Sequence, residues 1–299
     1  MTKGLAERDK VRNLLGKVVS PEVAEELVST KELKLGGEEK LMTALFSDIA
    51  GFTSISEKMK PAHLLNLLNE YLSEMTDHIY DHGGTVDKFI GDAIVAFWGA
   101  PLPKKNHAEL CVRAAINMQK KLAELRSIWK KQGIAEIYMR IGINTGEMVV
   151  GNMGSKDRMD YTMIGDAVNL AARLEGANKY YGTEIMISEF TFTDVKENFL
   201  CRELDRVRVQ GKEKAITIYE VIDEIEHATQ EKHSAVNLFE EAVHAFRSYD
   251  FNKAENLLKR YNDPLENGDG ACKLYLKRMA ALKVNPPGEN WDRVYPLAK

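Results

Sequence analysis

The sequence predicts an α+β fold in which helices cover one face of an antiparallel sheet. Strand-like apolar runs alternate with amphipathic helical segments along residues 41–177, and turn pairs such as Gly91-Asp92 separate neighbouring strand-like runs. The elements follow in β-α-β-β-α-β order. That order is typical of the split βαβ, ferredoxin-like arrangement, which leaves the other face of the sheet free for a partner.

The first strand is predicted at residues 41–46, an apolar run with the length of a buried strand. Residues 1–40 before it are charged and mostly helical in pattern, and Ser20-Pro21 is typical of a helix start. We interpret this segment as an N-terminal helical connector, either a plain surface helix or one that transmits a signal. Asp48 then lies where the strand ends.

The next elements are a helix, a hairpin and a second helix. Residues 61–81 carry apolar side chains at helical spacing, and Gly83-Gly84 ends that helix. Two strand-like runs in residues 85–98 are joined by Gly91-Asp92, a pair suited to a two-residue turn, so Asp92 is predicted at a hairpin tip. A helix over residues 108–131 and a strand over 136–150, broken at residues 144–146, complete the core.

A further strand is predicted at residues 159–164, followed by a helix over 167–177 with Asp166 as its N-cap. Asn169 and Arg173 are four residues apart on that helix and therefore share a face. The face is either simply solvated or functional, because polar groups that follow a turn at a strand end often bind ligands. A guanidinium held there would be a strong phosphate ligand.

The two aspartates are most informative as a pair. Alone, Asp48 is compatible with helix capping and Asp92 with ordinary turn chemistry. Two carboxylates at the ends of apolar strands can instead converge on a hard cation such as Mg²⁺, which proteins usually hold with one or two carboxylates and substrate phosphates. The pair therefore predicts a site for metal and phosphate.

Composition narrows the partners and the compartment. The net charge of -4 and a pI near 6.0 argue against a nucleic-acid partner and favour a small molecule or a protein. The three cysteines are widely spaced, which fits a reducing compartment, and no apolar run has the roughly 18 residues of a membrane span. We expect a cytoplasmic protein, or the cytosolic part of a membrane-anchored one whose sensor or membrane domain lies outside this sequence.

Three stretches in this order resemble the catalytic domain of class III nucleotidyl cyclases, of the bacterial adenylate cyclase type, over residues 41–222: Phe-Ser-Asp-Ile-Ala-Gly-Phe-Thr at 46–53, Lys-Phe-Ile-Gly-Asp at 88–92 and Asp-Tyr-Thr-Met-Ile-Gly-Asp-Ala-Val-Asn-Leu-Ala-Ala-Arg at 160–173. The resemblance implies a lyase that converts ATP to 3′,5′-cyclic AMP and pyrophosphate. It also implies a head-to-tail homodimer, because sites in this family lie between two catalytic domains.

The roles that the resemblance implies are shared between metal, base and phosphates. Two divalent ions, Mg²⁺ or Mn²⁺, would be held by Asp48, Asp92 and the backbone carbonyl of Ile49; Lys88 and Thr162 would recognise the purine; Asn169 and Arg173 would act on the transition state. Gln210 stands where relatives usually carry a triphosphate-binding lysine, and Lys212 is the substitute, or else an exposed loop cation.

The purine-recognition pair favours ATP. Lys88 can only donate, which matches the unprotonated N1 of adenine, and the Thr162 hydroxyl can accept from the adenine amino group. Thr162 replaces the aspartate of many relatives and discriminates less, because a hydroxyl can also donate. The alternatives are a guanylate cyclase, or a catalytically silent cyclase-like domain that acts as a regulatory module.

Residues 223–299 are predicted to form a C-terminal helical tail. Its apolar spacing indicates a helix pair around residues 248–251, which resembles a single tetratricopeptide-like hairpin. Packing onto the catalytic domain is favoured over recruitment of a partner. A terminal segment with Trp291 is expected to be anchored by the tail.

Overall fold

The computed structural model describes residues 35–134, 136–208, 214–263, 265, 268–286, 288 and 291–297. Most of the predicted connector, together with Gln210 and Lys212, lies outside the described residues. The chain divides into two compact units: the first ends at Asn169 and leaves out Arg140–Ile143, and the second consists of Arg140–Ile143 and the chain from Leu170 onward. Among the described helices, none has both the length and the apolar character of a membrane span.

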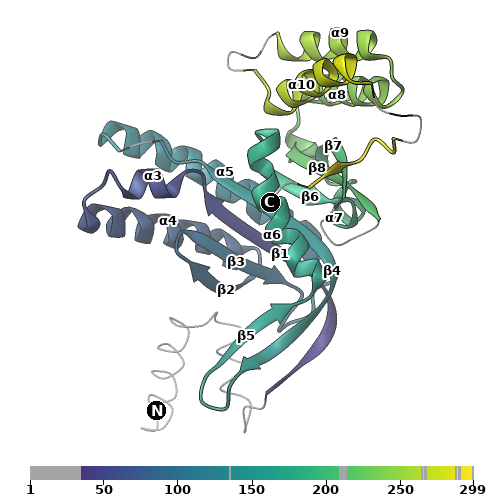
Figure 1. The fold of residues 1–299 in the computed structure, drawn as a ribbon. Helices are drawn as coiled ribbons and strands as arrows, with labels where there is room; N and C mark the ends of the chain where they lie inside the picture. Colours follow the sequence, from purple (N-terminus) through teal and green to yellow (C-terminus); the bar gives the residue numbers. More distant parts are fainter. Residues whose placement is uncertain are drawn as a thin grey trace, which may run out of the picture. The chain divides into compact units, whose positions relative to one another are not determined.

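The first unit contains the predicted α+β core (Figure 1). Its elements, in chain order, are β1 (Gly36–Ile49), α3 (Phe52–Ser56), α4 (Pro61–Asp81), β2 (Thr85–Ile90), β3 (Ala93–Trp98), α5 (His107–Lys131), β4 (Met139–Gly154) and β5 (Met159–Ile164). The strand order is β2-β3-β1-β4, with β5 paired to β4. Helices α4 and α5 pack against each other and against the strands. The β-α-β-β-α-β order is confirmed.

Two strand boundaries of this unit differ from the prediction. Strand β1 begins at Gly36, so the last five residues assigned to the connector belong to the sheet. Strand β4 continues through residues 144–146, where a break was predicted. The polar side chains there are satisfied inside the fold: Asn144 Nδ2 donates to the carbonyl of Ala167 at 2.8 Å, and the Thr145 and Thr43 hydroxyls lie 2.9 Å apart.

The second unit combines the end of the sheet with the C-terminal helices. Its elements are α6 (Asp166–Tyr181, from Leu170 onward), β6 (Ile185–Ser188), α7 (Glu189–Val195), β7 (Phe199–Arg208), β8 (Ala215–Glu224), η1 (Ile225–His227), α8 (Gln230–Arg247), α9 (Phe251–Asn262), α10 (Gly270–Val284) and β9 (Tyr295–Pro296). The first residues of β4 pair with β6 in parallel, and β7 pairs with β9 in parallel. The sheet is therefore mixed, not wholly antiparallel. Helix α6 forms the crossover connection that lets β6 run in the same direction as β4.

The tail has three described helices where a pair was predicted. Helix α10 was missed because apolar side chains are not confined to one stripe: Ala271, Cys272, Tyr275 and Met279 form its buried face, and Leu274 and Leu276 outside that face are partly buried. These helices share one hydrophobic core with β7 and with the Leu174–Tyr181 side of α6. Trp291 packs edge-on against Phe246, so the terminal segment is anchored as expected. The favoured packing of the tail is thus confirmed within this unit.

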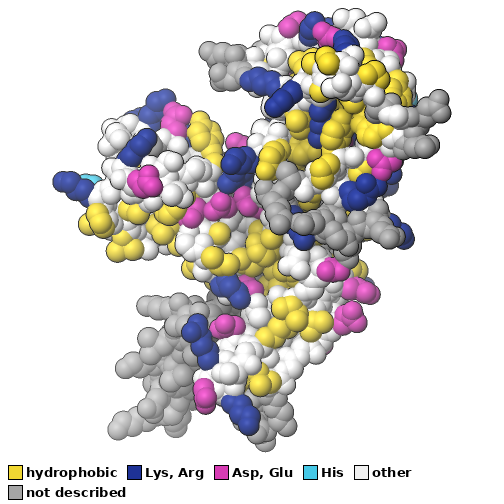
Figure 2. Space-filling view, in the orientation of Figure 1, with side chains coloured by type: hydrophobic (Ala, Val, Ile, Leu, Met, Phe, Trp, Pro, Cys, Tyr) yellow, Lys and Arg dark blue, Asp and Glu magenta, His cyan; other side chains and the backbone are white. Residues whose placement is uncertain are grey.

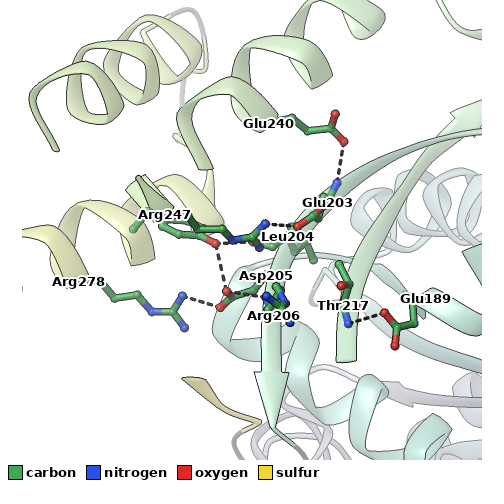
Figure 3. A network of polar contacts seen from close by, with 10 residues as sticks. Glu189, Glu203, Leu204, Asp205, Arg206, Thr217, Glu240, Arg247 and Arg278 are labelled. Atoms are coloured by element: carbon green, nitrogen blue, oxygen red, sulfur yellow. Dashed lines mark hydrogen bonds and ion pairs between the residues drawn. The ribbon is translucent and has the colours of Figure 1, made fainter. Parts of the chain in front are cut away.

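Two ion pairs, one of them buried, attach two of the tail helices to β7 (Figure 3). Asp205, whose side chain is 2% exposed, accepts from Arg278 Nη1 at 2.6 Å and from the Tyr181 hydroxyl at 2.7 Å. Arg247 of α8 pairs with Glu203, and Glu240 accepts from the Glu203 backbone N–H at 3.0 Å. Two tail helices are therefore tied to one strand by charge as well as by apolar packing.

We expect Asp205→Asn to lower the free energy of unfolding by about 3 kcal/mol, because the Arg278 guanidinium would stay buried without its counter-charge. Chemical denaturation measures this. The matched control is Asp292→Asn, since Asp292 pairs with Arg208 of the same strand but both side chains are nearly half exposed, 47% and 44%. The control should change stability far less. Equal losses in the two variants would contradict the importance assigned to the buried pair.

Candidate active site

The structure brings the two predicted aspartates together. Asp48 lies at the end of β1, and Asp92 lies in the turn between β2 and β3, where Gly91 adopts a left-handed φ of 66°. The backbone N–H of Ile49 donates to Asp92 Oδ2 at 3.0 Å. Burial, followed by the hydrogen bond and negative charge of Asp48, raises the pKa of the Asp92 carboxyl to about 6, and the Ile49 N–H opposes this rise. Two mutually repelling carboxylates are a donor set that fits a hard divalent cation.

In the metal-free protein we expect Asp92→Asn to raise the melting temperature, and to raise it more as the pH increases from about 4 to about 6. The unfolded chain loses the Asp92 proton near its ordinary pKa of 3.8, whereas the folded chain loses it near 6. The folded state binds the extra proton between these values, so wild-type stability falls as the pH rises through this window. Thermal melts of both proteins in a chelator measure the difference, and a difference independent of pH would contradict the coupling.

Lys88 and Thr162 are linked by a residue that the sequence analysis missed. Asp87, on β2, has a side chain that is 2% exposed. Its Oδ2 accepts from the Thr162 hydroxyl at 2.6 Å, and its Oδ1 lies 3.4 Å from Lys88 Nζ. Burial raises the pKa of the Asp87 carboxyl, while the hydrogen bond from Thr162 and the charge of Lys88 act in the opposite direction. The two predicted purine-recognition residues therefore meet at one carboxylate.

A β-bulge places Asp87 at this position. The register between β2 and β3 shifts between Val86 and Lys88, so Asp87 is the extra residue that has no partner on β3. Bulges re-aim side chains in this way. Strand β5 lies close to β2, and its Tyr161 ring contacts Phe97 of β3 at 6.2 Å between centroids. A charged residue within a strand-like run was the available signal, but its direction depends on the bulge.

Asn169 and Arg173 lie on the exposed side of α6, as their spacing predicts. Their apolar neighbours Val168, Ala171 and Leu174 are buried, so these side chains lie on the other side of the helix from the Arg173 guanidinium. The helix begins at Asp166, so Asp166 lies in the first turn and is not the predicted N-cap. Within the second unit, α6 approaches β4 so closely that a Cβ on Gly142 would lie 2.0 Å from the Glu175 nitrogen.

The model of the family described as "Adenylate and Guanylate cyclase catalytic domain" matches residues 37–222. This match covers more than half of the chain. The chain belongs to the class III nucleotidyl cyclases. The match also contains every site residue that the resemblance assigned, Lys212 included.

Named relatives of this cyclase domain are much longer proteins. Adenylate cyclase 1 of Rhizobium meliloti (strain 1021) is 39% identical over 181 residues, which are 60% of this chain and 27% of that protein. The adenylate cyclase of Anabaena cylindrica is 43% identical over 187 residues, which are 60% of this chain and 36% of that protein. This chain thus spans about a quarter to a third of the length of these two relatives.

Solved structures similar to this cyclase domain include proteins named for both products. The adenylyl cyclase CyaB from P. aeruginosa is 40% identical, with a TM-score of 0.60, and the alignment covers 65% of this chain and 100% of that chain. The guanylyl cyclase Cya2 is 36% identical, with a TM-score of 0.59, and the alignment covers 65% of this chain and 98% of that chain. Overall similarity does not show whether the base of the substrate is adenine or guanine. That choice depends on the site residues.

Proposed function

We propose that this cyclase domain converts ATP to 3′,5′-cyclic AMP and pyrophosphate at shared sites of a homodimer in the cytoplasm. The observation that carries the choice of cyclisation is the pairing of Asp48 with Asp92 at the ends of two strands, linked through the Ile49 N–H. The choice of ATP is supported by Lys88 and Thr162, which meet at Asp87. The names of the adenylate cyclase relatives agree with this choice.

Each residue has a separate role in this proposal. Asp48, Asp92 and the Ile49 carbonyl would hold two divalent ions, Mg²⁺ or Mn²⁺, which supply Lewis-acid activation of the 3′-hydroxyl and neutralise phosphate charge. Arg173 stabilises the charge that develops on the α-phosphate, a contribution worth ~10³ to 10⁵ in rate in comparable phosphoryl-transfer enzymes. Asn169 orients the ribose or Arg173, and Lys212 binds the triphosphate.

A homodimer is supported by two features of the exposed surface. Large apolar side chains lie on the strands of the first unit with roughly half of their surface exposed: Leu41 59%, Phe89 48%, Ile90 61% and Ile164 54%. Figure 2 shows that hydrophobic side chains reach the surface of the chain in several clusters. Exposed apolar groups of this kind mark interaction surfaces. Asn169 and Arg173 are exposed as well, which suits residues that complete a site with a second chain.

Product formation from ATP and from GTP, each with Mg²⁺ or Mn²⁺ over a range of protein concentrations, tests the proposal. We expect cyclic AMP, with a specific activity that rises with protein concentration as the dimer forms. Cyclic GMP as the main product would favour the alternative of a guanylate cyclase. No product from either nucleotide, with a dimer confirmed by mass, would favour a silent regulatory module.

A further inference from the structure

We propose that Asp87 is the positioning residue that makes this domain select adenine, because it takes up the Thr162 hydroxyl proton in a hydrogen bond and leaves Thr162 able only to accept. This inference rests on the proposed function and deepens it. The Thr162 side chain alone does not decide between adenine and guanine, since a free hydroxyl can present either its proton or its lone pairs.

The contact with Asp87 fixes which way the Thr162 hydroxyl points its proton. The Thr162 oxygen lies 2.6 Å from Asp87 Oδ2, a length typical of a charge-assisted O–H···O⁻ bond. A carboxylate can only accept, so the hydroxyl is the donor in this bond. Thr162 is 9% exposed and Asp87 is nearly buried, which limits competition from water. The remaining lone pairs of Thr162 can then accept only from a donor such as the 6-amino group of adenine.

Lys88 lies beside the same carboxylate, that of Asp87, and also favours adenine. Asp87 Oδ1 is buried, and among the described residues none forms a hydrogen bond to it, but Lys88 Nζ lies 3.4 Å away. The ammonium group carries three protons, so it can remain paired with Asp87 while it donates to the unprotonated N1 of adenine. Guanine would offer its N1–H to a donor and its O6 to an acceptor. Both contacts would be mismatched, and unpaired polar groups in a buried site are costly.

The decisive variant is Asp87→Asn, which keeps the shape and changes the polarity. Lys88 favours the amide oxygen on its own side, so the amide NH₂ turns toward Thr162 and becomes the donor in that contact. The Thr162 proton is then free to bind guanine O6. We expect the ratio of kcat/KM for ATP to that for GTP to fall by about tenfold or more, as the loss of one discriminating hydrogen bond implies. A loss shared equally by both nucleotides is what a purely structural bond would produce, and it would overturn the proposal.

The matched control is Asp160→Asn. Asp160 lies two residues before Thr162 on β5, is exposed, and affects Asp87 only through its charge. This variant changes the local charge by the same amount and leaves the bond between Asp87 and Thr162 in place, so its ATP to GTP ratio should stay within about twofold of wild type. A ratio that falls as far as in Asp87→Asn would show that charge, not hydroxyl direction, sets the preference.

Thr162→Val tests the same idea without altering Asp87, and serves if Asp87→Asn fails to fold. An acceptor-only hydroxyl helps ATP and offers nothing to GTP, so kcat/KM should fall for ATP and should not fall for GTP. Equal falls would overturn the inference.

Binding of 3′-deoxy-ATP and 3′-deoxy-GTP, which lack the attacking hydroxyl, measures the same preference between adenine and guanine without turnover. If the wild type forms no product but binds the adenine analogue preferentially through Asp87, the proposed function fails and the inference stands; if it binds neither analogue, both fail.

Discussion

Asp92→Asn and Asp48→Asn should each lower cyclase activity by about a thousandfold or more. Each removes a negative charge that holds the metal ions, and these ions stabilise the phosphate charge of the transition state by several kcal/mol. The measurement is kcat for cyclic AMP formation at saturating Mn²⁺. Saturating metal matters, since a variant that only weakens metal affinity would recover at high concentration. Failure to recover would place the loss in the catalytic step.

The same variants should remain folded, which separates this result from a stability effect. The two carboxylates repel each other in the metal-free protein, and removal of one charge relieves the repulsion that raises the pKa of Asp92. We therefore expect unchanged secondary structure and an equal or higher melting temperature. Asp77→Asn is the matched control, because Asp77 is an exposed aspartate on α4 of the same unit. Near wild-type activity in Asp48→Asn or Asp92→Asn at limiting as well as at saturating Mn²⁺ would refute the assignment of that residue as a metal ligand.

The elements that the sequence predicted well are those set by local signals. Helix α4 and the hairpin of β2 and β3 match the predicted bounds, because Pro61 starts the helix and Gly91-Asp92 makes the turn within a few residues of chain. Asp48 and Asp92 could be paired in advance for the same reason. Each lies beside a strand end that the apolar pattern already marked.

The features that were missed depend on contacts between distant parts of the chain. Asp87 turns toward Thr162 only because of a bulge and because β5 lies close to β2, and the two residues are 75 positions apart in sequence. The polar residues at 144–146 look like a turn until Thr43 and Ala167 satisfy them. The same holds for Asp205, whose partner Arg278 is 73 positions away on a helix that has no clear apolar stripe. Local patterns carry no information on such pairings.

Equal amounts of inactive Asp92→Ala and inactive Arg173→Ala should together recover about a quarter of wild-type activity, if two symmetric sites are shared between chains. Complete subunit exchange makes half of the dimers mixed, and each mixed dimer has one intact site of two. That site takes its Asp92 from the Arg173→Ala chain and its Arg173 from the Asp92→Ala chain. The activity of the mixture over time, with exchange followed by a tag on one chain, measures the recovery.

The control for this experiment is a mixture of Asp92→Ala with Asp48→Ala. Both changes lie in the same half of the proposed site, so every site of the mixed dimer lacks one aspartate and no activity should return. Recovery in the first mixture and not in the second would assign Asp48 and Asp92 to one chain and Arg173 to the other. No recovery in the first mixture, with exchange demonstrated, would refute the shared site, because a site built between two chains must be repaired when each chain brings the half that the other lacks.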